Sequence, residues 1–376
     1  MSTSSADGGP LTTAAVGQQG SRTDSVRKSP AGARGFLILH EFPAPDVERA
    51  WRECLTRVEI PAHYESPEYF LDPLRQGTRP FAVLAREGDR VRGVTTGFHL
   101  GKQVMCGLIS RPQICVDDPQ DQATLESLAQ GLLQESRDAQ LVSIFTWEGL
   151  DLPPFSAHGF RLQQLAGSVV LDLTLGADEL FKQFSKDRRR NIRYAEKNGV
   201  EVREAVSDQD IVDAHRVYST WRGTDRKQVH GDWSFESFEK TMRLRANRRL
   251  FLAFYEGQVI AINIFRFFPG GLFESAANSS LDQFMNLKPN DLLQWRGIQW
   301  ACAQGLRRHS LGGTHTFLLR FGGKVVPVIR YRLDRTLLKR HDLKDSLRAT
   351  ARSLLRSAPA GVDQTVRKLL GKRPAH

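Results

Sequence analysis

Residues 81–98 read FAVLAREGDRVRGVTTGF, and residues 251–265 read FLAFYEGQVIAINIF. Each stretch is an apolar run, a short Glu-Gly turn and a second apolar run, which is typical of a β-hairpin. Gly88 and Gly257 supply the backbone of the two turns. The same pattern at two places indicates that one structural unit occurs twice in the chain.

The residues that follow each hairpin repeat the same order of elements. We predict a third strand at 104–115 and 271–277, a helix at 120–137 and 290–304, and a closing strand at 141–145 and 309–311. The predicted helices begin 32 residues after Gly88 and 33 residues after Gly257. This shared spacing predicts two copies of one mixed α/β unit.

Each unit is also predicted to begin with a strand and helices. In the first unit these are a strand at 36–41 and a helix at 46–57. The second unit has a strand at 200–205 and helices at 208–221 and 234–245. A strand at 168–175 and a helix at 177–198, ended by Gly199, join the two. We therefore expect an α/β (α+β) fold of mixed sheets with a first half at 35–165 and a second half at 166–335.

The composition is that of an ordinary globular protein. The 376 residues are 40% hydrophobic and 25% charged. No apolar run approaches the roughly 20 residues that cross a bilayer. Residues 1–34 are rich in Ser, Thr, Gly and Ala and have no apolar stretch typical of a secretion signal, so we expect them to be disordered and the protein to be cytoplasmic. The four cysteines form no CxxC pair, which argues against a disulfide framework or a metal site.

Positive charge is concentrated at the C-terminal end. The net charge is +11, and the segment from residue 335 onward holds eleven Lys and Arg against three Asp. We expect residues 336–376 to form a basic helical tail. Leu343, Leu347, Leu354 and Leu355 are spaced as on one helix face. The tail could lie on an anionic membrane surface, pack on the core, or be a solvated helix that aids solubility.

The helix predicted between the halves carries a cationic stripe. Lys186, Arg190, Arg193 and Lys197 are spaced so that they share one face. Like charges at this spacing repel each other, so keeping them has a cost. The stripe predicts binding of a phosphate-rich ligand such as a nucleotide, a lipid pyrophosphate or tRNA. The alternative is a solvated helix face.

Three segments in the second half resemble a known family. These are SKDRRRNIRYAEKNG at 185–199, LKPNDLLQWRGIQWACAQG at 287–305 with Leu-Gly-Gly at 311–313, and FLLRFGG at 317–323. They are similar to segments of FemAB-like and BioF-like acetyltransferases, which are GNAT-superfamily proteins with tandem GNAT domains. The resemblance covers about residues 165 to 335.

The resemblance implies an acyltransferase in which an amine attacks an activated carbonyl group. The implied donor is acyl-CoA as a co-substrate, with no permanently bound cofactor, and the implied acceptor is an amine of a cell-envelope or polysaccharide precursor, small or lipid-linked. One alternative is aminoacyl transfer from aminoacyl-tRNA to a peptidoglycan precursor. Another is a non-catalytic double-GNAT scaffold in envelope assembly.

Two departures from the family pattern bear on the donor. No glycine-rich phosphate loop precedes either predicted helix, where the sequence reads NLKPN at 286–290 and VDDP at 116–119. The lysine of the family's F-K-x-x-F-G segment is Leu318 here, and Arg320 follows two residues later. In a strand, Arg320 would lie on the same face as Leu318 and could replace that charge.

We name Glu274 and Arg320 as candidate catalytic residues. Glu274 lies in a predicted strand where GNAT cores separate their central strands, so its carboxylate could take a proton from an amine. The alternative is a surface-facing residue on that strand. The candidate donor- or acceptor-binding residues are Lys186, Arg190, Arg193, Asn278, Ser279 and Asn290.

Overall fold

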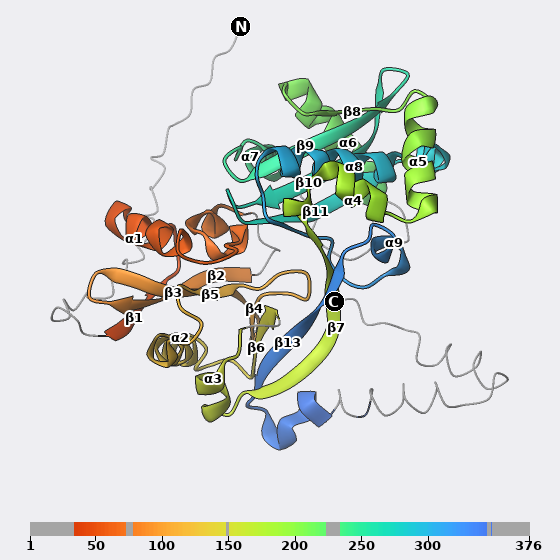
Figure 1. Ribbon diagram of the computed structural model, residues 1–376. Helices are drawn as coiled ribbons and strands as arrows, with labels where there is room; N and C mark the ends of the chain where they lie inside the picture. The colour runs from red at the N-terminus through yellow and green to blue at the C-terminus, as the bar shows by residue number, and fades with distance from the viewer. Residues whose placement is uncertain (1–33, 73–77, 148–149, 223–233, 344–346, 348–376) are drawn as a thin grey trace, which may run out of the picture.

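The computed structural model describes residues 34–72, 78–147, 150–222, 234–343 and 347. Its strands form one 13-stranded sheet in the order β1-β2-β3-β4-β6-β13-β7-β12-β11-β10-β9-β8, with β5 paired to β3 (Figure 1). The strands of the first half thus occupy one end of the sheet, and most strands of the second half occupy the other. The expected α/β fold of two similar halves with a mixed sheet is confirmed.

The first half contains the following elements: β1 (Arg34–Leu39), α1 (Pro45–Leu55), β2 (Thr78–Glu87), β3 (Arg90–Leu100), β4 (Gln103–Cys106), β5 (Ile114–Val116), α2 (Gln122–Glu135), β6 (Leu141–Trp147) and α3 (Pro153–Ala157). Two 3₁₀ turns lie between α1 and β2, η1 (His63–Glu65) and η2 (Pro67–Leu71). The β2–β3 hairpin occurs where it was predicted, with Gly88 at a φ of 61° that a residue with a side chain rarely adopts.

The second half repeats this arrangement with these elements: β7 (Arg161–Asp172), α4 (Ala177–Gln183), α5 (Lys186–Lys197), β8 (Glu201–Glu204), α6 (Asp208–Arg222), α7 (Phe235–Met242), β9 (Arg248–Tyr255), β10 (Gln258–Phe267), β11 (Leu272–Ser280), η4 (Asp282–Leu287), α8 (Pro289–Ala303), β12 (Arg308–Ser310), α9 (Thr316–Leu319) and β13 (Lys324–Asp334). The β9–β10 hairpin and α8 match the prediction.

The last strand joins the halves. β13 pairs with β7 from Lys324 to Arg332 and with β6 from Val328 to Asp334. Tyr331 of β13 is buried in the first-half core, and its hydroxyl accepts a hydrogen bond from the Leu152 amide at 3.0 Å. Figure 1 shows β7 and β13 as a long curved pair that runs from one half to the other. The expected boundary between 165 and 166 falls inside β7.

The linking helix predicted at 177–198 is in fact two helices. α4 ends where Phe184 adopts an extended backbone, and Ser185 then caps α5 by accepting a hydrogen bond from the Arg188 amide. The break turns the Phe184 ring into the core, where it contacts Trp295 and Phe321 edge-on. Packing of one aromatic ring therefore overrides a helical pattern that continues through the break.

One further prediction on local structure was wrong. The strand predicted at 104–115 is divided into β4 and β5 by the loop 107–113. Arg320 would share a face with Leu318 only in a strand, and this condition is not met, because α9 ends at Leu319 and Arg320 has a helical backbone.

The terminal segments are described only in part. Residues 1–33 of the predicted disordered segment, and residues 344–346 and 348–376 of the predicted tail, lie outside the described residues. Among the helices that the structure describes, none is long and apolar enough to cross a membrane.

Candidate functional site

The central strands of the second half separate and form a V. β11 and β12 pair in parallel only from Leu272 to Glu274 and from Arg308 to Ser310, and β11 then continues to Ser280 without β12 beside it. The register between β10 and β11 skips Ala276, which marks a bulge directly after the separation. We call this region the second V, with its apex at Glu274 and Ser310.

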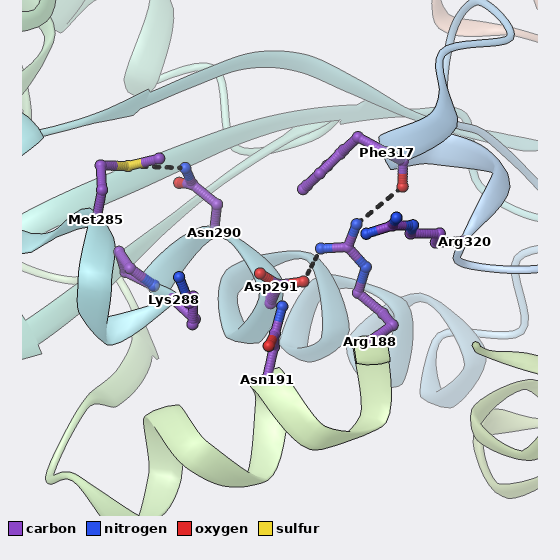
Figure 2. Close-up of a pocket in the computed structure, with 9 residues that line it drawn as sticks. Arg188, Asn191, Met285, Lys288, Asn290, Asp291, Phe317 and Arg320 are labelled. Carbon is purple, nitrogen blue, oxygen red and sulfur yellow. Dashed lines mark hydrogen bonds and ion pairs between the residues drawn. The ribbon is translucent and has the colours of Figure 1, made fainter. Parts of the chain in front are cut away.

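A pocket of about 230 Å³ lies beyond the open end of β11, at the N-terminus of α8. We call it the α8 pocket (Figure 2). Its lining residues are Arg188, Asn191, Met285, Lys288, Pro289, Asn290, Asp291, Phe317 and Arg320. Lys288 precedes α8 with a left-handed backbone (φ 60°) and its side chain does not cap the helix. The positive end of the helix dipole and the first-turn amides therefore face a site lined by cations.

Arg188 anchors the wall of this pocket. Its side chain is only 3% exposed, forms an ion pair with Asp291, and donates a hydrogen bond to the Phe317 carbonyl at 2.9 Å. Its guanidinium lies over the rings of Phe317 and Phe321, at 4.0 and 4.4 Å from their centroids. Burial and the neighbouring Arg320 lower the pKa of Arg188 to about 10, so it stays charged at neutral pH.

The pocket carries an excess of positive charge. Asp291 offsets Arg188, whereas Lys288 and Arg320 form no ion pair with any residue that the structure describes. Phe317 and Met285, 46% and 43% exposed, add apolar surface to the lining. Figure 2 shows Arg320 beside Arg188 and Phe317, across the pocket from Lys288. The arrangement suits a ligand that combines an anionic group with an apolar part.

Glu274 lies at the other end of β11. It is 4% exposed, so the alternative of a surface-facing residue was wrong. Its Oε1 accepts a hydrogen bond from Nη1 of Arg111 at 2.9 Å. Arg111 belongs to the 107–113 loop of the first half, so a residue 163 positions away neutralises this carboxylate.

The predicted site residues fall into three places. Arg320 and Asn290 line the α8 pocket, and Asn290 donates a hydrogen bond to the Ser280 hydroxyl at 3.2 Å, which ties the pocket to the end of β11. Glu274 lies six residues before Ser280, which is roughly 20 Å along a strand. Half-buried Asn278 and buried Ser279 lie between them. The structure therefore does not bring Glu274 and Arg320 into one pocket.

The cationic stripe lies on the exposed side of α5, outside the α8 pocket. Lys186, Arg190, Arg193 and Lys197 are all exposed, as expected for one helix face. Asp187 reduces this charge, because it pairs with Arg190 at 2.9 Å.

Sequence reasoning missed Arg188, Asn191 and Lys288 as site residues. Arg188 could have been proposed from the sequence, since it lies in the 185–199 segment that carries the family resemblance. The stripe drew attention to the exposed face of α5 instead of the buried one.

Comparisons with known proteins agree with this architecture. Residues 182–321 match the acetyltransferase (GNAT) domain family, and the α8 pocket lies within that range. A search of curated proteins found no matching sequence. The match confirms the predicted GNAT domain in the second half of the chain.

Three solved structures share the fold at low sequence identity. FemX superposes with a TM-score of 0.54 at 14% identity, covering 69% of this chain and 89% of FemX. L-PGS from Bacillus licheniformis gives 0.55 at 13%, covering 79% of this chain and 93% of that one. A tandem GNAT protein from the clavulanic acid biosynthesis pathway gives 0.51 at 13%, covering 81% and 99%.

Proposed function

We propose that the protein is an acyltransferase of the GNAT type that holds its donor by phosphate groups in the α8 pocket and transfers the acyl group near Glu274. The observation that carries this proposal is the placement of two sites on one strand. A pocket lies at the end of β11, and its Lys288 and Arg320 pair with no carboxylate among the residues that the structure describes. A buried carboxylate lies at the separation of β11 and β12. Phosphate binding at a helix N-terminus and a carboxylate for proton transfer are the two requirements of such a reaction.

In the proposed reaction a neutral amine attacks the donor carbonyl carbon. A C–N bond forms while the carbonyl π electrons move to oxygen, and this charge needs a hydrogen-bond donor nearby. The bulge at Ala276 is a backbone position suited to that task, because its amide lies outside the regular β10–β11 register. The tetrahedral intermediate then expels the leaving group. Glu274 accepts the proton from nitrogen and returns it to the departing thiolate or alkoxide.

The separation of the two sites favours acyl-CoA as the donor. Roughly 20 Å of strand lies between Glu274 and the α8 pocket. In an acyl-CoA the pantetheine arm separates the thioester from the pyrophosphate, whereas in aminoacyl-tRNA the ester lies on the terminal ribose, close to its phosphate. The long arm suits this spacing better. The α8 pocket lacks a glycine cradle, so Lys288 and Arg320 would hold the phosphates with side chains.

Aminoacyl transfer from tRNA is the second candidate function, and the α5 stripe favours it. Arg188 and Asn191 line the pocket from one side of α5, while Lys186, Arg193 and Lys197 are exposed on the same helix. These exposed cations lie on the opposite side of α5 from the pocket, and a polyanion as large as tRNA can reach both by passing around the helix. Two of the structural neighbours, FemX and L-PGS, share this fold.

For the acceptor we propose an amine on a cell-envelope or polysaccharide precursor, free or lipid-linked, used on the cytoplasmic side of the membrane. The family resemblance and the basic tail support this assignment. A non-catalytic scaffold remains the competing function, because Leu318 replaces the family lysine.

The test is a two-donor assay with the full-length protein. Labelled acyl-CoA and charged tRNA are each incubated with a panel of amine acceptors, and transfer of label is measured. We expect transfer from acyl-CoA, together with a higher Tm in the presence of CoA, since a ligand of the native state stabilises it. Transfer from charged tRNA alone would assign the second function. If neither donor gives transfer and the Tm does not change, the result would favour the non-catalytic scaffold function.

A further inference from the structure

The 107–113 loop of the first half reaches the apex of the second V. The Ser310 hydroxyl, at the end of β12, donates a hydrogen bond to the Ser110 carbonyl. The next residue of the loop, Arg111, donates to Glu274. Both residues that define the apex are thus contacted by the same loop, which comes from the other half of the chain.

Arg111 is held in one orientation. Its guanidinium carbon lies 3.4 Å from the centroid of the Tyr64 ring, so the ring covers one face of the cation while Glu274 accepts from its edge. Burial opposes its charge, but the pKa of Arg111 is nevertheless raised by Tyr64 and Glu274. A permanently charged group therefore faces the Glu274 carboxylate.

The remaining charged groups around the apex are occupied with one another. Arg266 lies opposite Glu274 in the β10–β11 register, where it donates to the Tyr64 hydroxyl and contacts Asp72 at 3.6 Å. Asp72 also pairs with Arg248 and accepts from His63 at 2.9 Å. Burial, followed by Arg248 and Arg266, lowers the pKa of His63 well below its usual range, so His63 is neutral. Among the residues that the structure describes, Arg111 is the cation that bonds Glu274 directly.

We propose that Arg111 is a positioning residue, supplied by the first half, whose charge and hydrogen bond hold the Glu274 carboxylate at the apex of the second V. This inference rests on the proposed function, because Glu274 acts there as the proton acceptor. A carboxylate removed from water takes up a proton unless an opposite charge or hydrogen bonds favour its charged form. The first half would therefore contribute one charged side chain to a reaction centred in the second half.

The experiment compares pH–rate profiles of Arg111→Gln, Arg111→Lys and the wild type. In Arg111→Gln we expect the acid limb to move up by about one pH unit, so that the rate falls about ten-fold at a pH below both limbs and recovers at a pH above both. Arg111→Lys keeps the charge without the planar fork and should restore most of the acid limb. Arg307→Gln is the matched control, because Arg307 also bonds across the halves, to the Glu59 carbonyl at 2.7 Å, without contacting Glu274. Its profile should equal that of the wild type.

A second measurement does not depend on turnover. Carboxyl-¹³C glutamate labelling, with Glu274→Gln to assign the signal, follows proton uptake by Glu274 directly. Proton uptake by Glu274 at a higher pH in Arg111→Gln than in the wild type supports the inference. This holds even if neither donor reacts, and in that case only the proposed function fails. Uptake at the same pH in both proteins, in folded samples, overturns the inference even if transfer occurs. If Arg111→Gln does not fold, Arg111→Met, which also removes the charge, is compared with the wild type by the same signal.

Discussion

The two halves contain the same pair of separating strands but use them differently. In the first half, β4 pairs in parallel with β6 from Gln103 to Cys106. Cys106 is thus the counterpart of Glu274, the last paired residue before the strands separate. The Cys106 side chain is fully buried, and burial raises the pKa of its thiol to about 12, so it is neutral at physiological pH. One apex is therefore inert, and the other holds an ion-paired carboxylate.

The residues after each apex differ as well. In the first half the 107–113 loop folds back on itself: Gln113 accepts a hydrogen bond from the Gly107 amide at 2.7 Å, and Leu108 pairs with Arg111. In the second half, β11 continues to Ser280 and leads into η4 and the α8 pocket. In the first half, the 107–113 loop therefore fills the region after the strand separation. The same loop also contacts the apex of the second V.

The helix N-termini complete the contrast. Asp121 caps α2 by accepting from the amides of Ala123 and Thr124. Although burial opposes it, hydrogen bonds from Arg34 and Thr124 lower the pKa of Asp121 to about 2. The α2 N-terminus therefore already holds its own anion, whereas α8 begins at Lys288 without a side-chain cap. Of these two helix ends, α8 is the one without a side-chain cap, and its first-turn Asp291 is paired with Arg188.

The largest expected effect tests the two apices. Glu274→Gln keeps the size of the side chain but removes the proton acceptor, so turnover should fall about 10²- to 10⁴-fold. The Tm should fall as well, because buried Arg111 loses its counter-ion. Cys106→Ala is the corresponding change in the first half and should keep wild-type kcat. Steady-state kinetics and thermal melts measure both. A folded Cys106→Ala protein that loses turnover as fully as Glu274→Gln would refute the division of roles.

The second prediction concerns the buried ion pair of the α8 pocket. Arg188→Ala leaves the Asp291 carboxylate, 5% exposed, without its partner, so the free energy of unfolding should fall by about 3–5 kcal/mol. Removing both charges in Arg188→Met/Asp291→Leu should recover most of this loss, because the penalty comes from the unpaired charge. Urea unfolding measures both variants. Equal destabilisation of the single and double variants would show that the pair itself supplies the stability.

The third prediction places an aspartate at the N-terminus of α8, where α2 has Asp121. Lys288→Asp replaces a cation of the pocket with a carboxylate, and aspartate tolerates the left-handed backbone of this position better than most residues. We expect the KM for the donor to rise about 10- to 100-fold with little change in kcat, because a charge-assisted contact is replaced by repulsion. The uncharged variant Lys288→Met should fall between Asp and the wild type. A KM that does not change in either variant would place the donor phosphates elsewhere.

Local patterns predicted much of this fold. The hairpins, α2 and α8 follow from periodicity and turn glycines, and the resemblance marked the position of Glu274 at a strand separation. Neither β13 lying between β6 and β7 nor the pairing of Arg111 with Glu274 could be predicted, because both depend on contacts between distant parts of the chain. Arg188 was missed for a related reason. Its neighbours are also charged, and only tertiary packing determines which arginine of the run is buried.

The smallest expected effect separates the α8 pocket from the α5 stripe. Arg193→Ala and Lys197→Ala change exposed side chains that do not line the pocket. Single exposed charges contribute little to the binding of a small ligand in physiological salt, so the KM for acyl-CoA should change less than about two-fold. A tRNA donor would respond differently, because each lost phosphate contact weakens binding and reduces its salt dependence. Filter binding of charged tRNA at two salt concentrations, compared with acyl-CoA kinetics on the same variants, measures the difference. A large change in the KM for acyl-CoA would show that the donor site includes the exposed face of α5. The buried and exposed faces of that helix would then not differ in their role in donor binding.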